Sequence, residues 1–270
     1  MTPTTIELAE LTKIALEAAT VAGKLVHAAW RKYPIAERKG RIDLVTEWDR
    51  RSEACIAEFL AKRAPFPIIG EEGTGHTRTA TEAPTWYVDP IDGTTNFVHG
   101  HPFYNVSVGL AQNGNPLLGA VVAPALGICW TGYAGGPAER NGETCFVSKV
   151  NDLDDALVAT GFPYDRRTNP DNNLAPFIHM KTKLLGARRC GAAAIDLCFV
   201  ADGTYDAYWE RTVRPWDITA GAAIVRAAGG IVTHYSGAPF NVAEPHLLAA
   251  NALLHPHILA ELKKAPLTFE

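Results

Sequence analysis

A strand-like apolar run that ends in two aspartates is the feature that most constrains the fold of this chain. In the segment TWYVDPIDGTTNF (residues 85–97), Asp89 and Asp92 follow the apolar run directly. Pro90 stiffens the loop between them, and Gly93 permits an unusual turn after them. Carboxylates seldom follow a buried run unless a positive charge offsets theirs. The fold is therefore expected to open the end of a strand onto a site that holds a cation.

The composition excludes several classes of protein. Hydrophobic residues make up 47% of the 270 residues and charged residues 20%, as in an ordinary soluble enzyme. The formal net charge of -4 gives no basic surface for nucleic acid, and no apolar run reaches the length of a membrane span. Acidic residues near the start argue against a secretion signal, and five scattered cysteines without a CxxC pair argue for reduced thiols. We expect a cytoplasmic protein with no membrane partner, for which nucleic acid is a poor partner.

The first half of the chain, residues 1–150, has the pattern of an α+β protein. Helical spacing of apolar residues predicts two long helices, and runs rich in β-branched and aromatic residues predict an antiparallel meander. The second helix is expected to begin at Asp43 or Thr46. This half is predicted to pack its helices against a mostly antiparallel sheet. The helices are expected at 6–30 and 43–63, and the strands at 65–70, 83–90, 103–112, 115–124 and 127–135.

The second half, residues 151–270, alternates strands and helices, which favours an α/β arrangement with helices flanking a sheet. No repeat, low-complexity segment or long linker separates the two halves, so one compact structural unit is expected. The strands are expected at 156–162, 205–210, 231–235 and 247–251, and the helices at 172–186, 191–203, 216–230 and 255–265.

Further acidic residues fall where predicted elements begin or end, which is where sites are built on open sheets. Glu71 and Glu72 follow a predicted strand, Asp217 begins a predicted helix, and Asp49 lies in another. Each has an ordinary alternative. Glu71 and Glu72 would form an exposed turn, Asp217 would be a helix N-cap, and Asp49 would lie on a solvated helical face.

Several carboxylates with few bases are the ligand set that hard cations such as Mg²⁺ prefer. The histidines do not suggest zinc, because no HxxxH or His/Cys framework surrounds His99 and His101. If a helix begins after Gly93, the N–H groups of Gly93 and Thr94 form an anion site beside the cation. Carboxylates that hold Mg²⁺ next to a helix N-terminus describe a phosphoryl-transfer site.

Three segments resemble, in order and spacing, the signatures of the inositol monophosphatase family: GEEG at 70–73, DPIDGTTNF at 89–97 and PWDITAGAAIVRAAGG at 215–230. The segment DLVTEWD at 43–49 is similar to the family's upstream motif, and RPWD looks like the bacterial branch. The resemblance covers essentially the whole chain. It implies a layered αβαβα sandwich of the inositol monophosphatase and fructose-1,6-bisphosphatase type. It also implies two to three Mg²⁺ ions per active site, inhibition by lithium and a homodimer.

The resemblance implies a role for each residue that matches a family motif. The implied metal ligands, most of them in the first half, are Glu71, Asp89, the backbone carbonyl of Ile91, Asp92 and Asp217. Thr94, with Asp49 behind it, would orient the attacking water, and Glu71 would help to take its proton. No phosphoenzyme would form. The implied phosphate and substrate contacts are Asp92, Gly93, Thr94, Ala193 and Glu210.

Substrate choice is expected to lie in the second half. Glu210 and Ala193 match polyol-contacting positions of inositol phosphatases, so the resemblance favours myo-inositol 1-phosphate. Relatives that hydrolyse fructose 1,6-bisphosphate, histidinol phosphate or NADP provide the alternatives. Arg214 stands where animal members carry a histidine, which leaves the polyol open.

Three further basic residues, Arg188, Arg189 and Lys39, have expected roles outside the motifs. One of Arg188 and Arg189 is expected to pair with an acid at a subunit interface. Lys39 would either close over the metals or be solvated.

Two alternatives come from other classes. In haloacid-dehalogenase-type phosphatases an Asp-x-Asp loop supplies the nucleophile, but Asp89 and Asp92 are one residue too far apart for that pattern. Lys183 and the pair Asp154-Asp155 would have to complete such a site. Some bacterial relatives instead act as partners of the transcription machinery, with dispensable catalysis; the full set of acids favours an enzyme.

Overall fold

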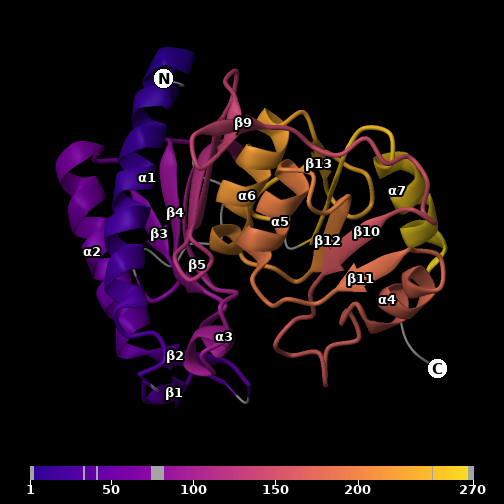
Figure 1. Cartoon of the computed structure of the whole chain (residues 1–270), viewed down its shortest axis with the longest axis horizontal. Helices are drawn as coiled ribbons and strands as arrows, with labels where there is room; N and C mark the ends of the chain where they lie inside the picture. Colours follow the sequence, from indigo (N-terminus) through magenta and orange to yellow (C-terminus); the bar gives the residue numbers. More distant parts are fainter. Residues whose placement is uncertain (1–2, 33, 41, 74–81, 245, 267–270) are drawn as a thin grey trace.

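The chain folds into five layers in which helices and sheets alternate (Figure 1). The computed structural model describes residues 3–32, 34–40, 42–73, 82–244 and 246–266. The long helices are α1 (Thr5–His27), α2 (Glu47–Arg63), α4 (Leu174–Lys181), α5 (Ala193–Ala201), α6 (Pro215–Ala227) and α7 (His255–Lys264). Helices α1 and α2 cover one face of a seven-stranded sheet, α5 and α6 separate this sheet from a five-stranded one, and α4 and α7 close the far side. The αβαβα sandwich is confirmed.

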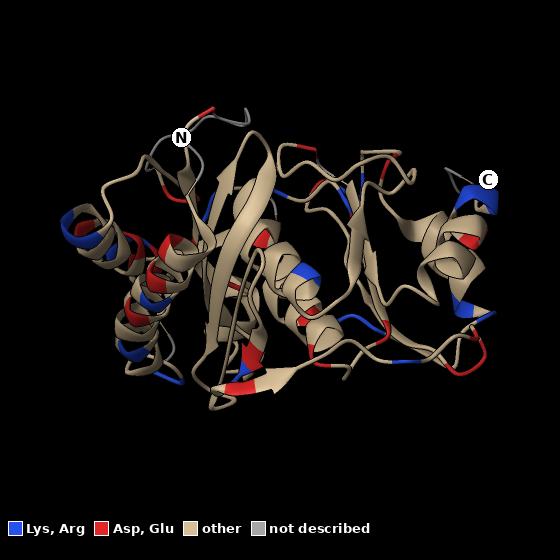
Figure 2. Cartoon of the chain, turned by 90° about the horizontal axis from the view of Figure 1, so that it is seen from above, with Lys and Arg blue, Asp and Glu red and all other residues tan. Residues whose placement is uncertain are grey.

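Charged residues lie mainly on the outer layers. Figure 2 shows acidic and basic residues interspersed along α1 and α2, with few in the central strands. Among the helices that the structure describes, none is long and apolar enough to cross a membrane.

The seven-stranded sheet forms the larger core. Its strands, in spatial order, are β3 (Ile68–Gly70), β4 (Thr85–Asp92), β5 (Asn105–Gln112), β6 (Asn115–Ala123), β7 (Ile128–Tyr133), β8 (Ala138–Arg140) and β9 (Glu143–Cys145). Strands β3 and β4 are parallel, and the other neighbours are antiparallel. The predicted meander is confirmed at β5, β6 and β7, and β8 and β9 extend it. Every residue of β5 is buried because helices cover both faces, and its outward and inward positions are therefore both mostly apolar or small.

Helix α2 begins after Thr46, which is its N-cap residue. The Thr46 side chain caps the helix, while Asp49 accepts a hydrogen bond from the Thr46 backbone N–H, so the two residues form a capping box. Asp43 is not the cap. A short hairpin that the sequence did not predict, β1 (Ala36–Arg38) with β2 (Leu44–Thr46), leads into this helix.

A row of glycines lets α6 approach the large sheet. Gly109, Gly119 and Gly132 are paired neighbours on β5, β6 and β7. A Cβ atom on Gly109 would lie 2.7 Å from the backbone nitrogen of Ala220, and one on Gly132 would lie 2.9 Å from the Cα of Ile224. The helix therefore packs directly against the strand backbones. Helix α6 belongs to the predicted second half of the chain, so the two predicted halves share this interface. The boundary between them at residue 150 stays a prediction.

The five-stranded sheet is smaller and mixed, in the order β11-β10-β12-β14-β13. Its predicted neighbour, a helix at 172–186, is wrong at its C-terminal end: α4 ends at Lys181 and the chain enters β11. The strands of this sheet are β10 (Leu157–Thr160), β11 (Gly186–Arg188), β12 (Ala207–Arg211), β13 (Ile231–Thr233) and β14 (His246–Ala250).

In the first half of the chain, a five-residue helix, α3 (Thr94–Val98), follows Asp89 and Asp92.

Candidate active site

A cavity of about 440 Å³ lies between the two sheets at the end of β4. It brings together all but one of the residues expected in the site. The exception is Asp49, which lies beneath the cavity wall. The predicted residues that line the cavity are Glu71, Asp89, Ile91, Asp92, Gly93, Thr94, Ala193, Glu210 and Asp217.

The spacing of three between Asp89 and Asp92 is accommodated by an irregularity in β4. Residues three apart in a regular strand point to opposite faces. Here the pairing register with β5 shifts between Asp89 and Asp92, and both line the cavity. Ser52 of α2 donates a 2.9 Å hydrogen bond to the carbonyl of Pro90 at this shift. The bulge thus re-aims one acid, as bulges beside active sites commonly do.

Asp92 is held by donors from two other elements. Its Oδ2 accepts hydrogen bonds from the side-chain amide of Asn105 (2.9 Å) and from the backbone N–H of Ala194 at the start of α5 (2.8 Å). Burial raises the pKa of Asp92 to about 6, and these hydrogen bonds oppose that rise. The Ala194 contact ties the large sheet to the helix layer behind it.

The remaining acids of the cluster repel one another. Burial raises the pKa of Asp89 well above its ordinary value, and the charges of Glu71 and Asp92 raise it further. Burial does the same to Asp217, followed by the charges of Asp92 and Glu71. Burial raises the pKa of Glu71 to about 7 despite the nearby Lys39. Four carboxyl groups therefore share one buried electrostatic environment.

This donor set fits a hard divalent cation. Carboxylate and carbonyl oxygens are the ligands that Mg²⁺ prefers, and a cation relieves the repulsion that raises these pKa values. Within the described residues, no three Asp, Glu, His or Cys side chains already converge closely enough to enclose a metal ion. The four acids of the cluster nevertheless line one cavity.

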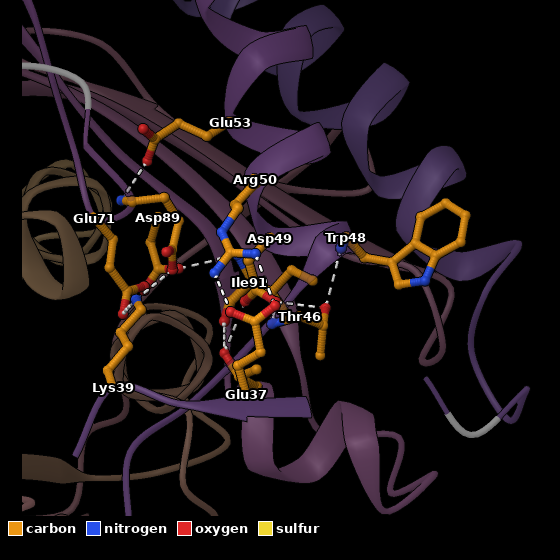
Figure 3. A network of polar contacts seen from close by, with 12 residues as sticks. Glu37, Lys39, Thr46, Trp48, Asp49, Arg50, Glu53, Glu71, Asp89 and Ile91 are labelled. Carbon is orange, nitrogen blue, oxygen red and sulfur yellow. Dashed lines mark hydrogen bonds and ion pairs between the residues drawn. The ribbon is translucent and has the colours of Figure 1, made fainter. Parts of the chain in front are cut away.

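Asp49 is hydrogen-bonded to Thr46, as Figure 3 shows, and also to Thr94, which lines the cavity. Asp49 Oδ2 accepts from the backbone N–H (2.7 Å) and hydroxyl (2.6 Å) of Thr46, and Oδ1 accepts from the Thr94 hydroxyl (3.0 Å). The Thr94 oxygen also lies 3.0 Å from the Ile91 carbonyl, but it has one proton, and the carboxylate is the stronger acceptor. The solvated-face alternative for Asp49 is wrong, because this side chain is fully buried.

The turn that carries Glu71 and Glu72 is anchored from both sides. Lys39 Nζ lies 3.1 Å from Glu71 Oε1 and also pairs with Glu72, as Figure 3 shows for Glu71. From behind, Glu53 of α2 accepts a 2.7 Å hydrogen bond from the backbone N–H of Glu72. A Cβ on Gly70 would lie 2.8 Å from Glu53 Oε1, so glycine leaves room for this carboxylate. The turn is half-buried, and Lys39, although exposed as a residue, is paired with both of its acids.

The far wall of the cavity comes from the second half of the chain. Glu210, at the end of β12, accepts a hydrogen bond from the Tyr208 hydroxyl, and burial raises its pKa to about 7. Asp217 accepts a 2.8 Å bond from the backbone N–H of Arg214, so it satisfies the start of α6 while it faces the cavity. Arg214 also lines the cavity.

The remaining basic residues divide by position. Arg189 lines the cavity, whereas Arg188 is exposed on β11. Lys183 pairs with Glu261 of α7 at 3.3 Å and does not line the cavity, which removes the lysine that a haloacid-dehalogenase-type site would need. A subunit-interface role for Arg188 or Arg189 stays a prediction.

One cavity-lining acid was missed as a substrate contact: Asp196 on α5. It had a signal in the sequence, since it is the single charged residue in the otherwise apolar helix AAIDLCFVA. Tyr164 also lines the cavity and lies in the segment 157–167, which resembles the pocket-lining segment of inositol-type family members.

An αβαβα sandwich whose buried carboxylates, threonine and short helix meet at one cavity defines a phosphatase of the metal-dependent type. The chain belongs to the inositol monophosphatase family, whose model matches residues 7–267, and this family is generally Mg²⁺-dependent. The predicted resemblance is thereby confirmed.

Relatives of known name cover nearly the whole chain. An inositol-1-monophosphatase from Synechocystis is 39% identical over 259 residues, which are 96% of this chain and 90% of the relative. The Nus factor SuhB of Pseudomonas aeruginosa is 38% identical over 268 residues, covering 93% of this chain and 98% of that protein. The solved structure of an inositol monophosphatase from Anabaena superposes with a TM-score of 0.86 at 37% identity, covering 97% of this chain and 98% of that one.

Proposed function

We propose that this protein is a Mg²⁺-dependent phosphomonoester hydrolase and that myo-inositol 1-phosphate is the ester it prefers. The observation that carries the proposal is a cluster of four carboxylates, Asp89 and Asp92 buried and Glu71 and Asp217 half-buried, that lines the same cavity as the Gly93-Thr94 turn. A phosphate ester is the ligand class that needs both parts. The cations neutralise its charge, and backbone N–H groups bind its oxygens.

Magnesium held by Glu71, Asp89, the Ile91 carbonyl, Asp92 and Asp217 would supply positive charge to the phosphate and to the entering and leaving oxygens. We infer two ions, with a third, weaker one near Glu71. The protein's own groups would do the rest. The N–H groups of Gly93 and Thr94 would position the phosphate for in-line attack.

Thr94 would orient the attacking water, and Glu71 would accept its proton. The Thr94 proton is engaged by Asp49, which leaves the hydroxyl oxygen to accept a hydrogen bond from water and orient it. Glu71 lines the same cavity as Thr94 and would help to take the water's proton. Because this route uses water, no aspartyl phosphate is expected.

The polyol preference rests on the far wall. Glu210 would accept a hydrogen bond from a hydroxyl of the substrate, Ala193 would contact the ring, and Asp92 would touch a further hydroxyl. A cavity of about 440 Å³ suits a small ester. The Synechocystis relative is named for this activity. Fructose 1,6-bisphosphate, histidinol phosphate and NADP are the competing substrates, and a homodimer, lithium inhibition and a cytoplasmic location complete the proposal.

A single-turnover reaction in ¹⁸O-labelled water tests the chemistry. With Mg²⁺ and excess enzyme, one labelled oxygen is expected in the released phosphate, and acid-quenched enzyme is expected to carry no phosphate. A phosphoaspartate trapped on Asp89 or Asp92 would refute water attack and restore the haloacid-dehalogenase-type alternative.

The relative named Nus factor SuhB supports a second candidate of another class, a partner of the transcription machinery. The two candidate functions differ in whether the protein's cellular role requires the carboxylates of the cluster. Replacing a carboxylate of the cluster abolishes an enzyme's function but leaves a binding partner's cellular role intact.

A further inference from the structure

Asp196 is a buried acid whose environment the proposed chemistry does not explain. It lies in the first turn of α5, one turn after Ala193, and both residues line the cavity. Its side chain is 2% exposed, and Oδ1 has no hydrogen-bond partner among the described residues. A buried carboxylate oxygen without a donor costs free energy, which makes it an unusual feature of a helix that is otherwise apolar.

The neighbours of Asp196 are charged but do not satisfy it. Glu210 and Asp92 are close enough for their charges to raise the Asp196 pKa, after burial, which is the main cause. The charge of Arg189 acts in the opposite direction. Asp196, Glu210 and Arg189 therefore line the cavity close to Asp92 of the carboxylate cluster.

Glu210 beside it is held firmly. Its carboxylate accepts a hydrogen bond from the Tyr208 hydroxyl and lies where a side chain on Gly161 would otherwise be. Elsewhere in the same half, buried Asp206 accepts a 2.7 Å bond from the backbone N–H of Leu157. The protein thus satisfies its structural acids here. Asp171 Oδ1 has no hydrogen bond either, but it pairs with Arg211. Among the described buried acids of this half, Asp196 is the exception, and it lines the ligand cavity.

The missing donor has a definable chemistry. With the phosphate placed at the Gly93-Thr94 turn, the group that reaches Asp196 belongs to the leaving alcohol. A second phosphate would be repelled by Asp196 and Glu210, whereas a hydroxyl donates a hydrogen bond and carries no charge. Two acids alone would also attract an ammonium group on the alcohol. Arg189 offsets part of their negative charge and so makes this ammonium group a less favourable ligand.

We propose that Asp196 is a specificity-determining residue that accepts a hydrogen bond from a second hydroxyl of the substrate, next to the one bound by Glu210. The inference rests on the proposed function and narrows it. The substrate class is an ester whose alcohol carries neighbouring free hydroxyls, as in a cyclitol or sugar monophosphate. Esters without such hydroxyls would not use Asp196.

The test compares two esters in the full-length protein with Mg²⁺. Asp196→Ala is expected to lower kcat/KM for myo-inositol 1-phosphate about tenfold, mostly through KM, which is the loss that one hydrogen bond gives. The loss for phenyl phosphate, which has no hydroxyl on its alcohol part, is expected to be much smaller. Asp196→Asn keeps an acceptor oxygen and is expected to recover part of the activity on the inositol ester.

Thermal unfolding separates a binding role from a structural one. Because Asp196 Oδ1 has no partner to lose, Asp196→Asn is expected to leave the Tm unchanged or raise it. Asp206→Asn is the matched control: it weakens the Leu157 contact, so it is expected to lower the Tm without changing the ratio of the two esters.

Two results would overturn the inference: equal losses on both esters with Asp196→Ala, or a larger loss on histidinol phosphate than on the inositol ester. Failure of the proposed function has a different signature. In that case the unmodified protein hydrolyses neither phenyl phosphate nor the inositol ester with Mg²⁺, and both proposals fall together.

Discussion

On the side of the cavity built by the seven-stranded sheet, Asp49 and Asp92 accept hydrogen bonds from dedicated donors. On the opposite side, Asp196 has an oxygen with no donor among the described residues. The first side fixes its acids before any substrate arrives, as electrostatic catalysis requires. The second leaves hydrogen-bonding capacity for the ligand to fill. This contrast suggests that the first wall, together with Asp217 from α6, performs hydrolysis, and that Glu210 and Asp196 of the second wall select the alcohol.

The largest expected effect comes from removing one charge on the first side. Asp92→Asn keeps an oxygen that accepts from Asn105 and Ala194, but it loses a carboxylate of the cluster. We expect kcat to fall about 10³-fold or more, because the site can no longer balance the charge of its cations. Release of inorganic phosphate from the inositol ester measures this.

The same variant separates the two classes of function. A hydrolase loses its cellular role with Asp92→Asn, whereas a partner of the transcription machinery keeps it. Retained turnover in the folded variant would contradict the assignment of this wall to catalysis.

Next in size is the Thr94 hydroxyl. Thr94→Val keeps the shape of the side chain but removes the oxygen that Asp49 orients, and we expect kcat to fall about 10²-fold with KM little changed. Thr94→Ser retains the hydroxyl and is expected to stay within a few-fold of the unmodified protein. A loss confined to KM would place Thr94 in binding and not in orientation of water.

The pH dependence of Mg²⁺ binding has a definite sign. Glu71 and Asp92 have pKa values raised to about 7 and about 6, above those of the unfolded chain. Without Mg²⁺, the folded protein holds protons in this window that the unfolded chain has released. The acids' contribution to stability is therefore lost as pH rises from about 4 to about 7.

Mg²⁺ must displace those protons, so its affinity is expected to rise about tenfold from pH 6 to pH 8. The Mg²⁺-induced increase in Tm, measured across this range, reports it. With Asp92→Asn, the Mg²⁺-induced increase in Tm should depend less on pH. An increase in Tm that is equal at pH 6 and pH 8 would contradict the raised pKa values.

The smallest effect expected is that of Glu53, which acts through the backbone of Glu72. Glu53→Ala removes the acceptor behind the turn, and apparent Mg²⁺ affinity should weaken about fivefold, less than for a partner that touches a ligand directly. Glu53→Gln retains an acceptor and should restore binding. Glu58→Ala, on the exposed face of the same helix, is the matched control with no expected change in Mg²⁺ affinity.

The sequence predicted the acids of the first wall because they are local signals. Asp89, Asp92 and Glu71 each follow an apolar strand, and Pro90 and Gly93 mark the turn. The bulge that turns Asp89 and Asp92 to one side had no local signal, since it depends on pairing with β5. The family motifs supplied the roles that spacing alone left open.

Tertiary contacts explain what was missed. Asp49 reads as a solvated helical residue until Thr46 and Thr94 enclose it. The run 172–186 reads as one helix, but its end pairs with β10 as a strand. Asp196 stands out as the single charged residue of an apolar helix, but nothing local reveals that its oxygen lacks a donor.

A panel of phosphate esters with Mg²⁺ tests the division between the two walls most directly. The kcat/KM values of myo-inositol 1-phosphate, fructose 1,6-bisphosphate, histidinol phosphate and NADP are compared for one preparation of the full-length protein. We expect hydrolysis of each ester to require Mg²⁺ and the inositol ester to rank first. If the inositol ester ranked last, the wall that carries Asp196 and Glu210 would not select a polyol, and the account of substrate choice would be wrong.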